Sequence, residues 1–212
     1  MRLLVVGAAG RTGRLVLEQG IARGHEVMAL VRTPAKLGAG GNAARVVQGD
    51  AHRLGDVRRA VAGQDAVISA VGGSGVARAF ITALTGVAAR RFVMTSSRSV
   101  VATRPRFAVA LAWLAFRGPY ADLARAEGML EVSGLEWSVV RATMLTDKPF
   151  TGRVHTDFEA NATGGALTLT RADYAMTLLD VAEDPRMIRK AVGVCGAKPP
   201  RPNRRDLAGE RS

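Results

Sequence analysis

Three glycines near the N-terminus have the spacing and the setting of a phosphate-binding turn. Gly7, Gly10 and Gly13 form a G-x-x-G-x-x-G pattern between the apolar run of residues 2–6 and a helix-like stretch. Small residues let the backbone approach a phosphate closely, and the amides of the new helix face it with the positive end of the helix dipole. The better-known dinucleotide pattern is G-x-G-x-x-G, so the position between a strand and a helix strengthens the argument. We therefore predict a dinucleotide-binding loop with contacts from Gly7, Ala9, Gly10, Arg11, Thr12 and Gly13.

The end of the second predicted strand indicates which dinucleotide is bound. In NAD-binding domains an acidic residue at this point holds the ribose hydroxyls. Here the strand ends in Leu30-Val31 and is followed by Arg32 and Lys36, with no carboxylate in between. The guanidinium fork suits phosphate geometry, so these cations favour the 2′-phosphate of NADP(H) over NAD(H). The alternative is that Arg32 is a solvated turn residue.

Two later turns also follow predicted strands. Gly49, Asp50 and Ala51 come after the third strand, where Asp50 and Ala51 are in position to meet an adenine ring. Asp50 as a helix cap is an equally good interpretation. Gly72 and Gly73 follow the fourth strand, where a backbone without side chains can pass close to a cofactor, although a plain turn would explain them as well.

A parallel sheet would bring these turns together. Near-continuous apolar strands alternate with helical stretches up to residue 140, which is typical of a parallel sheet covered on both faces. Right-handed crossovers make this a doubly wound α/β sheet, with the ligand beyond the carboxyl ends of the strands. The predicted strands are residues 2–6, 25–31, 44–48, 65–71, 91–95 and 136–140, and the predicted helices are residues 10–22, 50–62, 74–88, 106–116 and 121–132.

Helix caps and the last strand complete the predicted elements. Ser74 is placed to cap the helix that follows the fourth strand. The alternation weakens beyond residue 141, but Thr170 and Asp173 have the spacing of a capping box. Residues 188–195 predict a final strand.

The composition fits one folded domain. The chain has 212 residues, of which 48% are apolar, and no apolar stretch approaches the length needed to span a bilayer. The most apolar run, residues 107–116, has arginines on both sides and predicts an amphipathic or buried helix. The N-terminal run is interrupted too early, by Gly10–Arg14, to be a signal peptide. We expect a Rossmann domain over residues 1–197, with a small substrate-side extension at its C-terminal end, and a basic, disordered tail over residues 198–212.

Cysteine content and charge limit the surroundings and the partners. The single Cys195 excludes an internal disulfide and fits a reducing, cytoplasmic compartment, and we interpret it as a small buried side chain rather than a nucleophile. The formal net charge is +12, but the arginines are scattered and aromatic residues make up only 5%. Because no basic stripe with stacking aromatics is present, we rank nucleic-acid binding last and expect a small-molecule partner and no membrane. The oligomeric state stays open.

A series of short motifs resembles one family of proteins. The motifs occur in the order Gly7–Gly13, Val31-Arg32, Gly49-Asp50, Asp65–Ile68, Thr95-Ser96-Ser97, Ser133–Arg141 and Leu145-Thr146-Asp147. Together they are similar to the atypical short-chain dehydrogenase/reductase group, which includes NmrA-like proteins and flavin reductases of the biliverdin reductase B type. The resemblance covers residues 1–195, and the block Ser133–Arg141 is more specific than the glycine motif.

The resemblance implies a Rossmann domain that binds NADPH, with an acceptor pocket beside the nicotinamide. It implies further cofactor contacts from Ala70, Val71, Gly72, Gly73 and Thr95. Ser96 matches a serine close to the nicotinamide and substrate and is the one catalytic candidate, with strand-end capping as the alternative. The apolar stretch 107–120 is a candidate wall or lid, with a dimer or core helix as the alternative. The candidate substrate-pocket residues are Ser97, Trp113, Tyr120, Met144 and Leu145.

The catalytic groups of related enzymes are missing from the sequence. Extended dehydrogenases use Tyr-x-x-x-Lys, but Tyr120 is followed four residues later by Ala124. Met144 stands where the flavin reductase has a histidine, and no spacing of ligands predicts a metal. We therefore predict hydride transfer from NADPH to a flat, electron-poor acceptor, flavin- or quinone-like, that takes its proton from water. The alternative is a redox sensor of the NmrA-like type that binds NADP(H) without turning it over.

Overall fold

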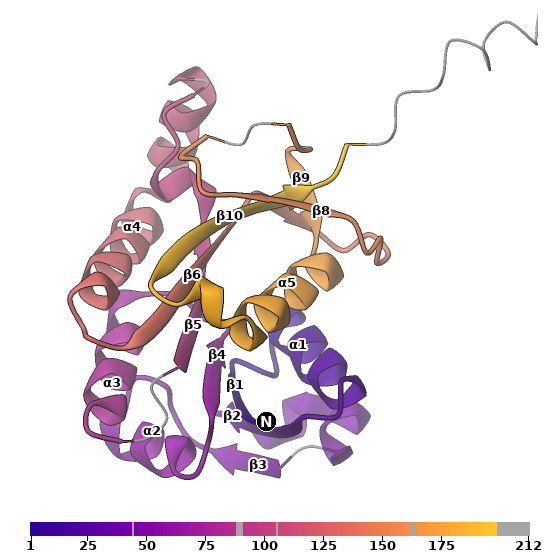
Figure 1. Ribbon diagram of the computed structural model, residues 1–212, viewed down its shortest axis with the longest axis vertical. Helices are drawn as coiled ribbons and strands as arrows, with labels where there is room; N and C mark the ends of the chain where they lie inside the picture. The colour runs from indigo at the N-terminus through magenta and orange to yellow at the C-terminus, as the bar shows by residue number, and fades with distance from the viewer. Residues whose placement is uncertain (44, 88–90, 105, 162–163, 199–212) are drawn as a thin grey trace, which may run out of the picture.

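A central sheet with helices on both sides organises the chain (Figure 1). The computed structural model describes residues 1–212 except 44, 88–90, 105, 162–163 and 199–212, so the predicted tail beyond Lys198 lies outside the described residues. The strands are β1 (Arg2–Val6), β2 (Glu26–Val31), β3 (Arg45–Gln48), β4 (Ala66–Ser69), β5 (Arg91–Ser97), β6 (Glu136–Ala142), β7 (Met144–Thr146), β8 (Val154–Asp157), β9 (Thr168–Thr170) and β10 (Lys190–Gly196). The helices are α1 (Arg11–Ala22), α2 (Leu54–Val61), α3 (Ser74–Leu84), α4 (Arg106–Glu131) and α5 (Arg171–Glu183), with short 3-10 helices at Pro34–Ala43, Arg98–Val100 and Pro185–Met187.

The strand order confirms the doubly wound α/β fold. The strands lie in the order β3-β2-β1-β4-β5-β6-β10-β8, and only the β10–β8 pair is antiparallel. The order reverses between β1 and β4. In such sheets ligands bind at this switch point, beyond the carboxyl ends of the strands.

Alternate side chains of each strand enter two separate cores. In β1, Leu3 and Val5 pack with α1 and α5, whereas Leu4 and Val6 pack with α2, α3 and α4. All four side chains are buried. Strands that are covered on both faces are apolar at nearly every position, and this explains the continuous apolar runs in the sequence.

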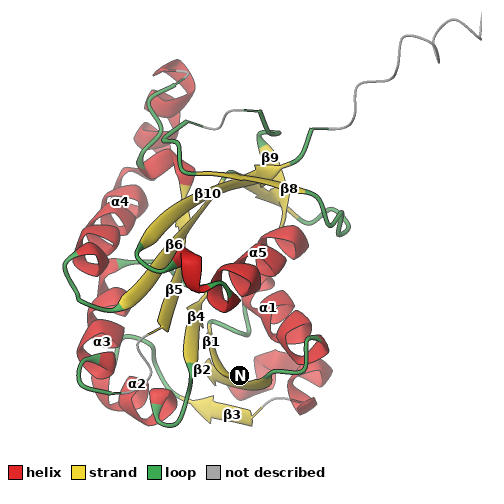
Figure 2. Ribbon diagram, in the orientation of Figure 1, coloured by secondary structure: helices red, strands yellow, loops and turns green. Residues whose placement is uncertain are grey.

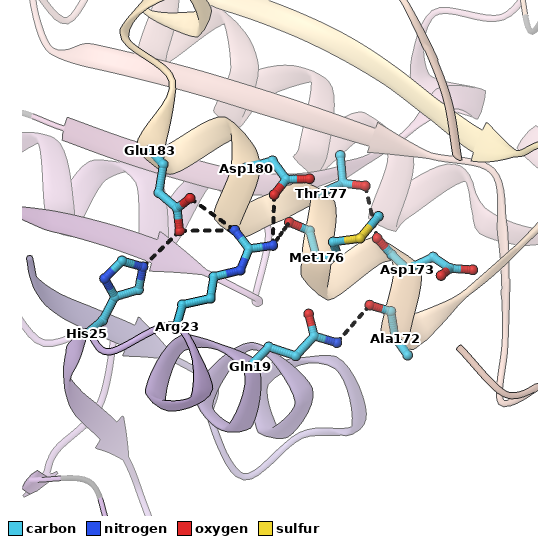
Figure 3. A network of polar contacts seen from close by, with 9 residues as sticks. All are labelled: Gln19, Arg23, His25, Ala172, Asp173, Met176, Thr177, Asp180 and Glu183. Atoms are coloured by element: carbon cyan, nitrogen blue, oxygen red, sulfur yellow. Dashed lines mark hydrogen bonds and ion pairs between the residues drawn. The ribbon is translucent and has the colours of Figure 1, made fainter. Parts of the chain in front are cut away.

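A polar network joins α1 to α5 (Figure 3). Arg23, just after α1, donates to Glu183 over 3.0 Å and forms an ion pair with Asp180 at 2.7 Å. His25 Nε2 lies 2.8 Å from Glu183 Oε1. Burial opposes the charge on Glu183, but the hydrogen bonds from His25 and Arg23 outweigh burial and lower the pKa of this carboxyl. The network therefore fixes the C-terminal end of the helix that begins at the glycine turn.

The start of α3 differs from its prediction. The sequence predicts Ser74 as the cap, but Gly73 occupies the N-cap position and Ser74 lies in the first turn. The backbone N–H of Ser74 donates to Asp122 of α4 over 3.1 Å, and the Ser74 hydroxyl donates to the same carboxylate. These bonds lower the pKa of Asp122. A carboxylate at a helix N-terminus satisfies free amides and complements the dipole, and here it comes from a distant helix that local sequence cannot indicate.

The helices predicted at 106–116 and 121–132 are one kinked helix. Within α4, Phe116 leaves helical geometry at φ −125° and ψ 29°. Pro119 follows shortly after, and its ring clashes with the preceding turn and offers no backbone N–H. The proline therefore bends the helix without ending it.

The part of the chain beyond β6 contains strands that were not predicted. β7 pairs with β9 in a separate parallel ladder, and β8 adds an antiparallel edge to β10. Strands this short carry too little periodicity to be recognised. The predicted cap of α5 is confirmed, because the Thr170 side chain accepts the Asp173 N–H over 3.0 Å, and the predicted last strand corresponds to β10.

Two glycines permit the tight turn between β1 and α1. Gly7 has a φ of 77°, in the left-handed region that side chains disfavour. Gly13 is buried in α1, and a Cβ at this position would clash with the Gly7 carbonyl and lie 2.6 Å from its carbon. The helix can therefore pack this closely onto the turn only when residue 13 is glycine.

We expect Gly13→Ala to disrupt this contact. The added methyl group must displace the Gly7 backbone, and the free energy of unfolding should fall by about 2 to 3 kcal/mol, measured by urea denaturation. Gly128→Ala in α4 is the matched control. A Cβ there meets nothing within 4 Å, so stability should stay level or rise by up to about 1 kcal/mol. Equal stabilities for the two variants would contradict the packing argument.

Candidate functional site

A hollow of about 670 Å³ lies at the carboxyl ends of β1, β2 and β3, next to the switch point. Its volume falls within the range of about 300 to 1,000 Å³ that is usual for small-molecule and cofactor sites. The lining residues are Val6, Gly7, Ala9, Gly10, Leu30, Val31, Arg32, Thr33, Lys36, Gly49, Asp50, Ala51, His52 and Val71. The structure thus brings together eight predicted cofactor residues: Gly7, Ala9, Gly10, Arg32, Lys36, Asp50, Ala51 and Val71.

The turn between β1 and α1 forms the glycine-lined part of this hollow. Gly10 is the N-cap of α1 and donates its N–H to the Gly7 carbonyl over 2.9 Å. Within the described residues no side chain caps this helix, so its first-turn amides are available to an anion. A Cβ at Gly10 would lie 3.2 Å from the Gly7 oxygen and would fill space beside the turn. This close, side-chain-free backbone fits a pyrophosphate.

The other predicted loop residues, Arg11, Thr12 and Gly13, do not line the hollow. Gly13 is buried beneath it. Arg11 donates to Asp147 over 3.1 Å, and Asp147 also accepts from Arg171 over 2.6 Å. Arg11 and Asp147 are both largely exposed, and exposed pairs of this kind contribute little to stability. Arg11 can therefore exchange this carboxylate for a bound phosphate at low cost.

Cations gather on one side of the hollow. Arg32 and Lys36 line it directly. Arg14 of α1 joins them, because its Nη2 donates to the Lys36 carbonyl over 2.9 Å. Sequence reasoning missed Arg14, since only the fold brings this helix beside the end of β2. Three positive side chains in one place favour a phosphate group.

Asp50 lies in a tight turn that also lines the hollow. Its Oδ1 accepts the backbone N–H of His52 over 3.0 Å and lies 3.0 Å from the His52 ring Nδ1. These bonds lower the pKa of Asp50, which stays ionised at neutral pH. The alternative role of Asp50 as a helix cap is wrong, because α2 begins at Leu54 with Arg53 as N-cap. His52 also lines the hollow and was missed, since a lone histidine on a polar turn has no motif.

The turns after β4 and β5 are held by packing and by buried hydrogen bonds. A Cβ at Gly72 would clash with Leu123 of α4 and lie 3.0 Å from the Thr95 carbonyl oxygen. Thr95 Oγ1 lies 2.5 Å from the Tyr174 hydroxyl, which donates to the Val140 carbonyl over 2.7 Å. Tyr174 is fully buried, and burial raises the pKa of its hydroxyl well above the ordinary value. Tyr174 therefore orders the strands and is not placed to supply a proton to a ligand. Ala70, Gly72, Gly73 and Thr95 do not line the hollow.

Ser96 belongs to a buried polar network. Its hydroxyl donates to Glu127 over 2.5 Å, and Glu127 also accepts from Arg141 over 2.6 Å and 3.1 Å. Ser96 and Glu127 are buried. The alternative role of Ser96 as a strand-end cap is wrong, because it is Ser97 that accepts the Ser99 N–H, over 3.3 Å, at the 3-10 helix after β5. Glu127 was missed because it stands alone in an otherwise ordinary helix sequence.

The other predicted pocket residues lie around the carboxyl ends of β5 and β6. Trp113 donates its indole N–H to the Ser99 carbonyl over 2.9 Å, and its ring meets Tyr120 edge-on at 5.7 Å. Met144 is exposed in β7, beside the partly buried Leu145. The structure thus places Ser97, Trp113 and Tyr120 near one another, and Met144 and Leu145 on the separate two-stranded ladder.

The described part of the chain contains no group of three or more His, Cys, Asp or Glu side chains that could hold a metal ion. None of its helices combines the length and the apolarity required to cross a bilayer.

A family model for NAD(P)H-binding proteins matches residues 7–185 of the chain. The chain belongs to this NAD(P)H-binding family. The match covers the glycine turn and every lining residue of the hollow except Val6. It confirms the prediction of NAD(P)H as the class of cofactor and agrees with the resemblance to the atypical short-chain dehydrogenase/reductase group.

Several solved structures share the fold. ChuY, an anaerobilin reductase from Escherichia coli O157:H7, has a TM-score of 0.80 at 24% identity, over 94% of this chain and 100% of that one. SP1627, a putative NADH-flavin reductase from Streptococcus pneumoniae TIGR4, has a TM-score of 0.78 at 24% identity, over 92% and 99%. A short-chain dehydrogenase/reductase from Veillonella parvula DSM 2008, crystallised with NADP, has a TM-score of 0.77 at 19% identity, over 94% and 95%. At these identities the likeness establishes the common fold.

We expect Glu127→Gln to destabilise the protein strongly. The change leaves the Arg141 guanidinium buried without its countercharge, and the free energy of unfolding should fall by about 3 kcal/mol in urea denaturation. The control is Glu131→Gln, one turn later on the same helix, where the side chain is exposed and the cost should stay below about 0.5 kcal/mol. A similar small effect for both variants would show that the network contributes nothing.

Proposed function

We propose that the protein is an NADPH-dependent reductase. The observation that carries this proposal is the group of cations at the end of β2, where Arg32 and Lys36 line one hollow with the glycine turn and Arg14 donates to the Lys36 carbonyl. A 2′-phosphate distinguishes NADP(H) from NAD(H), and a guanidinium fork with neighbouring ammonium charge suits it. The absence of a carboxylate directly after β2 supports the same choice, because such a residue holds the ribose hydroxyls in NAD-binding domains.

The residues of the hollow divide the binding between them. The amides at the start of α1, next to Gly7, Ala9 and Gly10, would hold the pyrophosphate. Asp50 and Ala51 would meet the adenine, and Ala70–Gly73 with Thr95 would lie beside the nicotinamide ribose. Bound NADPH supplies a hydride from C4 of its nicotinamide.

We further propose that the acceptor is small, planar and electron-poor, of the flavin or quinone type. Two ionisable groups near the ends of β5 and β6 support this, because they are already engaged: Tyr174 is buried, and Glu127 is paired with Arg141. An acceptor that takes its proton from water needs no side-chain acid, so the protein would contribute orientation. Ser96 would orient the acceptor or the carboxamide, with Ser97, Trp113, Tyr120, Met144 and Leu145 as candidate pocket residues.

The engagement of these ionisable groups also favours a second candidate function. A protein with no available proton donor could bind NADP(H) tightly and report its redox state to a partner without turning it over. The absence of a Tyr-x-x-x-Lys pair and the engagement of Ser96 with Glu127 fit this redox-sensor function. Turnover distinguishes the two functions.

The cofactor assignment is tested by Arg32→Asp. The change places a carboxylate beside the 2′-phosphate, so the dissociation constant for NADPH should rise about tenfold or more, while that for NADH changes by less than about threefold. Isothermal titration with both cofactors measures this. Arg58→Asp carries the same charge change on α2, beside a hollow at the other end of the sheet, and should leave both constants unchanged. Equal affinity of the wild type for NADPH and NADH would refute the assignment.

The reductase function is tested by NADPH oxidation with FMN and with menadione. We expect steady, saturable oxidation with at least one acceptor, and Arg32→Asp should raise the KM for NADPH with little effect on kcat, because Arg32 contacts only the non-reacting end of the cofactor. Tight NADPH binding without turnover over a broad acceptor panel would reject the reductase and favour the sensor.

A further inference from the structure

The first half of α4 exposes an apolar stripe. Phe107, Leu111 and Leu114 lie at positions i, i+4 and i+7 on one helix face. Their exposed fractions are 81%, 56% and 81%. Phe116 at the kink is 53% exposed. The sequence predicts an amphipathic or buried helix here, but the apolar face is turned to solvent. Contiguous apolar surface of this kind marks an interaction site in a soluble protein. We call Phe107, Leu111 and Leu114 the α4 stripe.

The opposite side of the same helix half is fixed to the body of the protein. Trp113 donates to the Ser99 carbonyl over 2.9 Å and packs edge-on against Tyr120. Phe116 also contacts Tyr120, with ring centroids 5.7 Å apart. The bond to Ser99 joins this half of α4 to the segment after β5, and the contacts with Tyr120 lie within α4 across its kink. Phe107, Leu111 and Leu114 stay exposed.

The charge around the α4 stripe is positive at both ends. Residues 99–121 contain Arg104, Arg106 and Arg117 and no Asp or Glu. All three arginines are exposed. Two copies of the stripe packed together would bring these like charges close to one another, whereas an anionic surface neutralises them. An apolar face bordered by arginines is the pattern of a helix that lies at a lipid interface.

Other apolar side chains lie at the same end of the molecule. The start of α4 and the β8–β9 region both extend beyond the carboxyl ends of the parallel strands, at the top of the view in Figure 2. Leu167 directly before β9 is 76% exposed, and Met144 at the start of β7, whose N–H donates to the Leu167 carbonyl, is 65% exposed. Lys148 and Arg153 are exposed between β7 and β8. Apolar and basic residues thus occur together on two separate segments of one end.

We propose that this end of the protein rests on an anionic phospholipid surface. The α4 stripe would lie at the boundary between headgroups and acyl chains, and the arginines would contact lipid phosphates. The stripe is too short to cross the bilayer, and no described helix can do so. The expectation of no membrane partner rested on spanning length, and a helix that lies in the interface needs no such length. The proposal is independent of the nature of the acceptor.

Co-sedimentation with lipid vesicles tests the proposal. The full chain should bind phosphatidylglycerol vesicles, and its binding to phosphatidylcholine vesicles should be weaker by a factor of about ten or more. The double variant Phe107→Ser/Leu114→Ser should lower the partition coefficient on phosphatidylglycerol about tenfold or more, with unchanged circular dichroism and urea midpoint. Val87→Ser/Val132→Ser, which alters exposed valines at the opposite end of the sheet, should bind as the wild type does.

A second pair of variants tests the charge. Arg106→Glu/Arg117→Glu should lower binding to phosphatidylglycerol about tenfold, and high salt should weaken the wild type to a similar degree. Arg58→Glu/Arg78→Glu on α2 and α3 makes the same charge change away from the stripe and should cost less than about threefold. An equal loss of vesicle binding for both pairs of variants would show that net charge alone governs binding, and this would overturn the role of the α4 stripe.

Two further outcomes would overturn the proposal. Full vesicle binding by Phe107→Ser/Leu114→Ser would place the contact elsewhere, for example on the basic residues 198–212. A dimer in light scattering that this double variant dissociates, together with no vesicle binding by the wild type, would assign the stripe to a second copy of the chain.

Discussion

The close contact between α1 and the turn that follows β1 is the constraint on which the candidate site depends. Gly13 has no side chain to keep the helix away from the Gly7 carbonyl, and Gly7 adopts a φ of 77° that allows the chain to enter the helix at once. Helix-dipole and amide interactions weaken within the first turn, so a displacement by one methyl group would weaken an anion site substantially. At its other end the helix is anchored to α5 through Arg23 and Glu183, which leaves it little freedom to tilt.

The kink in α4 divides the helix into two halves with different structural roles. Its second half brings Asp122 to the start of α3 and Glu127 to Ser96 and Arg141, so two carboxylates from α4 satisfy polar groups at the ends of β4, β5 and β6. Its first half turns away from this packing and carries the exposed α4 stripe. Both carboxylates are therefore engaged in holding the strands, and this fits the proposal of an acceptor that draws its proton from water.

Features that depend on a local sequence pattern could be predicted from the sequence. Features that depend on contacts between distant residues could not. The apolar strands up to β6, the glycine turn and the Thr170 cap follow from short-range spacing and are confirmed. The α3 cap was wrong because its partner, Asp122, lies 48 residues away in the sequence. Of the predicted cofactor residues, those at the ends of β1, β2 and β3 gather around the hollow together with Val71, since parallel strands end at one edge. Arg14 and His52 could not be found without the crossover that brings helix and turn together.

Which partners the net charge of +12 can attract depends on where the cations lie. Three arginines are held within the fold: Arg98 pairs with Asp157, the partly buried Arg141 pairs with Glu127, and Arg91 donates to backbone carbonyls, with burial lowering its pKa to about 10. The exposed cations of the described residues govern partners rather than folding. The cations at the hollow face amides of a helix N-terminus, which is a setting for a compact phosphate, whereas the arginines of α4 border an apolar face. The same charge thus predicts different ligands, and the neighbouring surface decides between them.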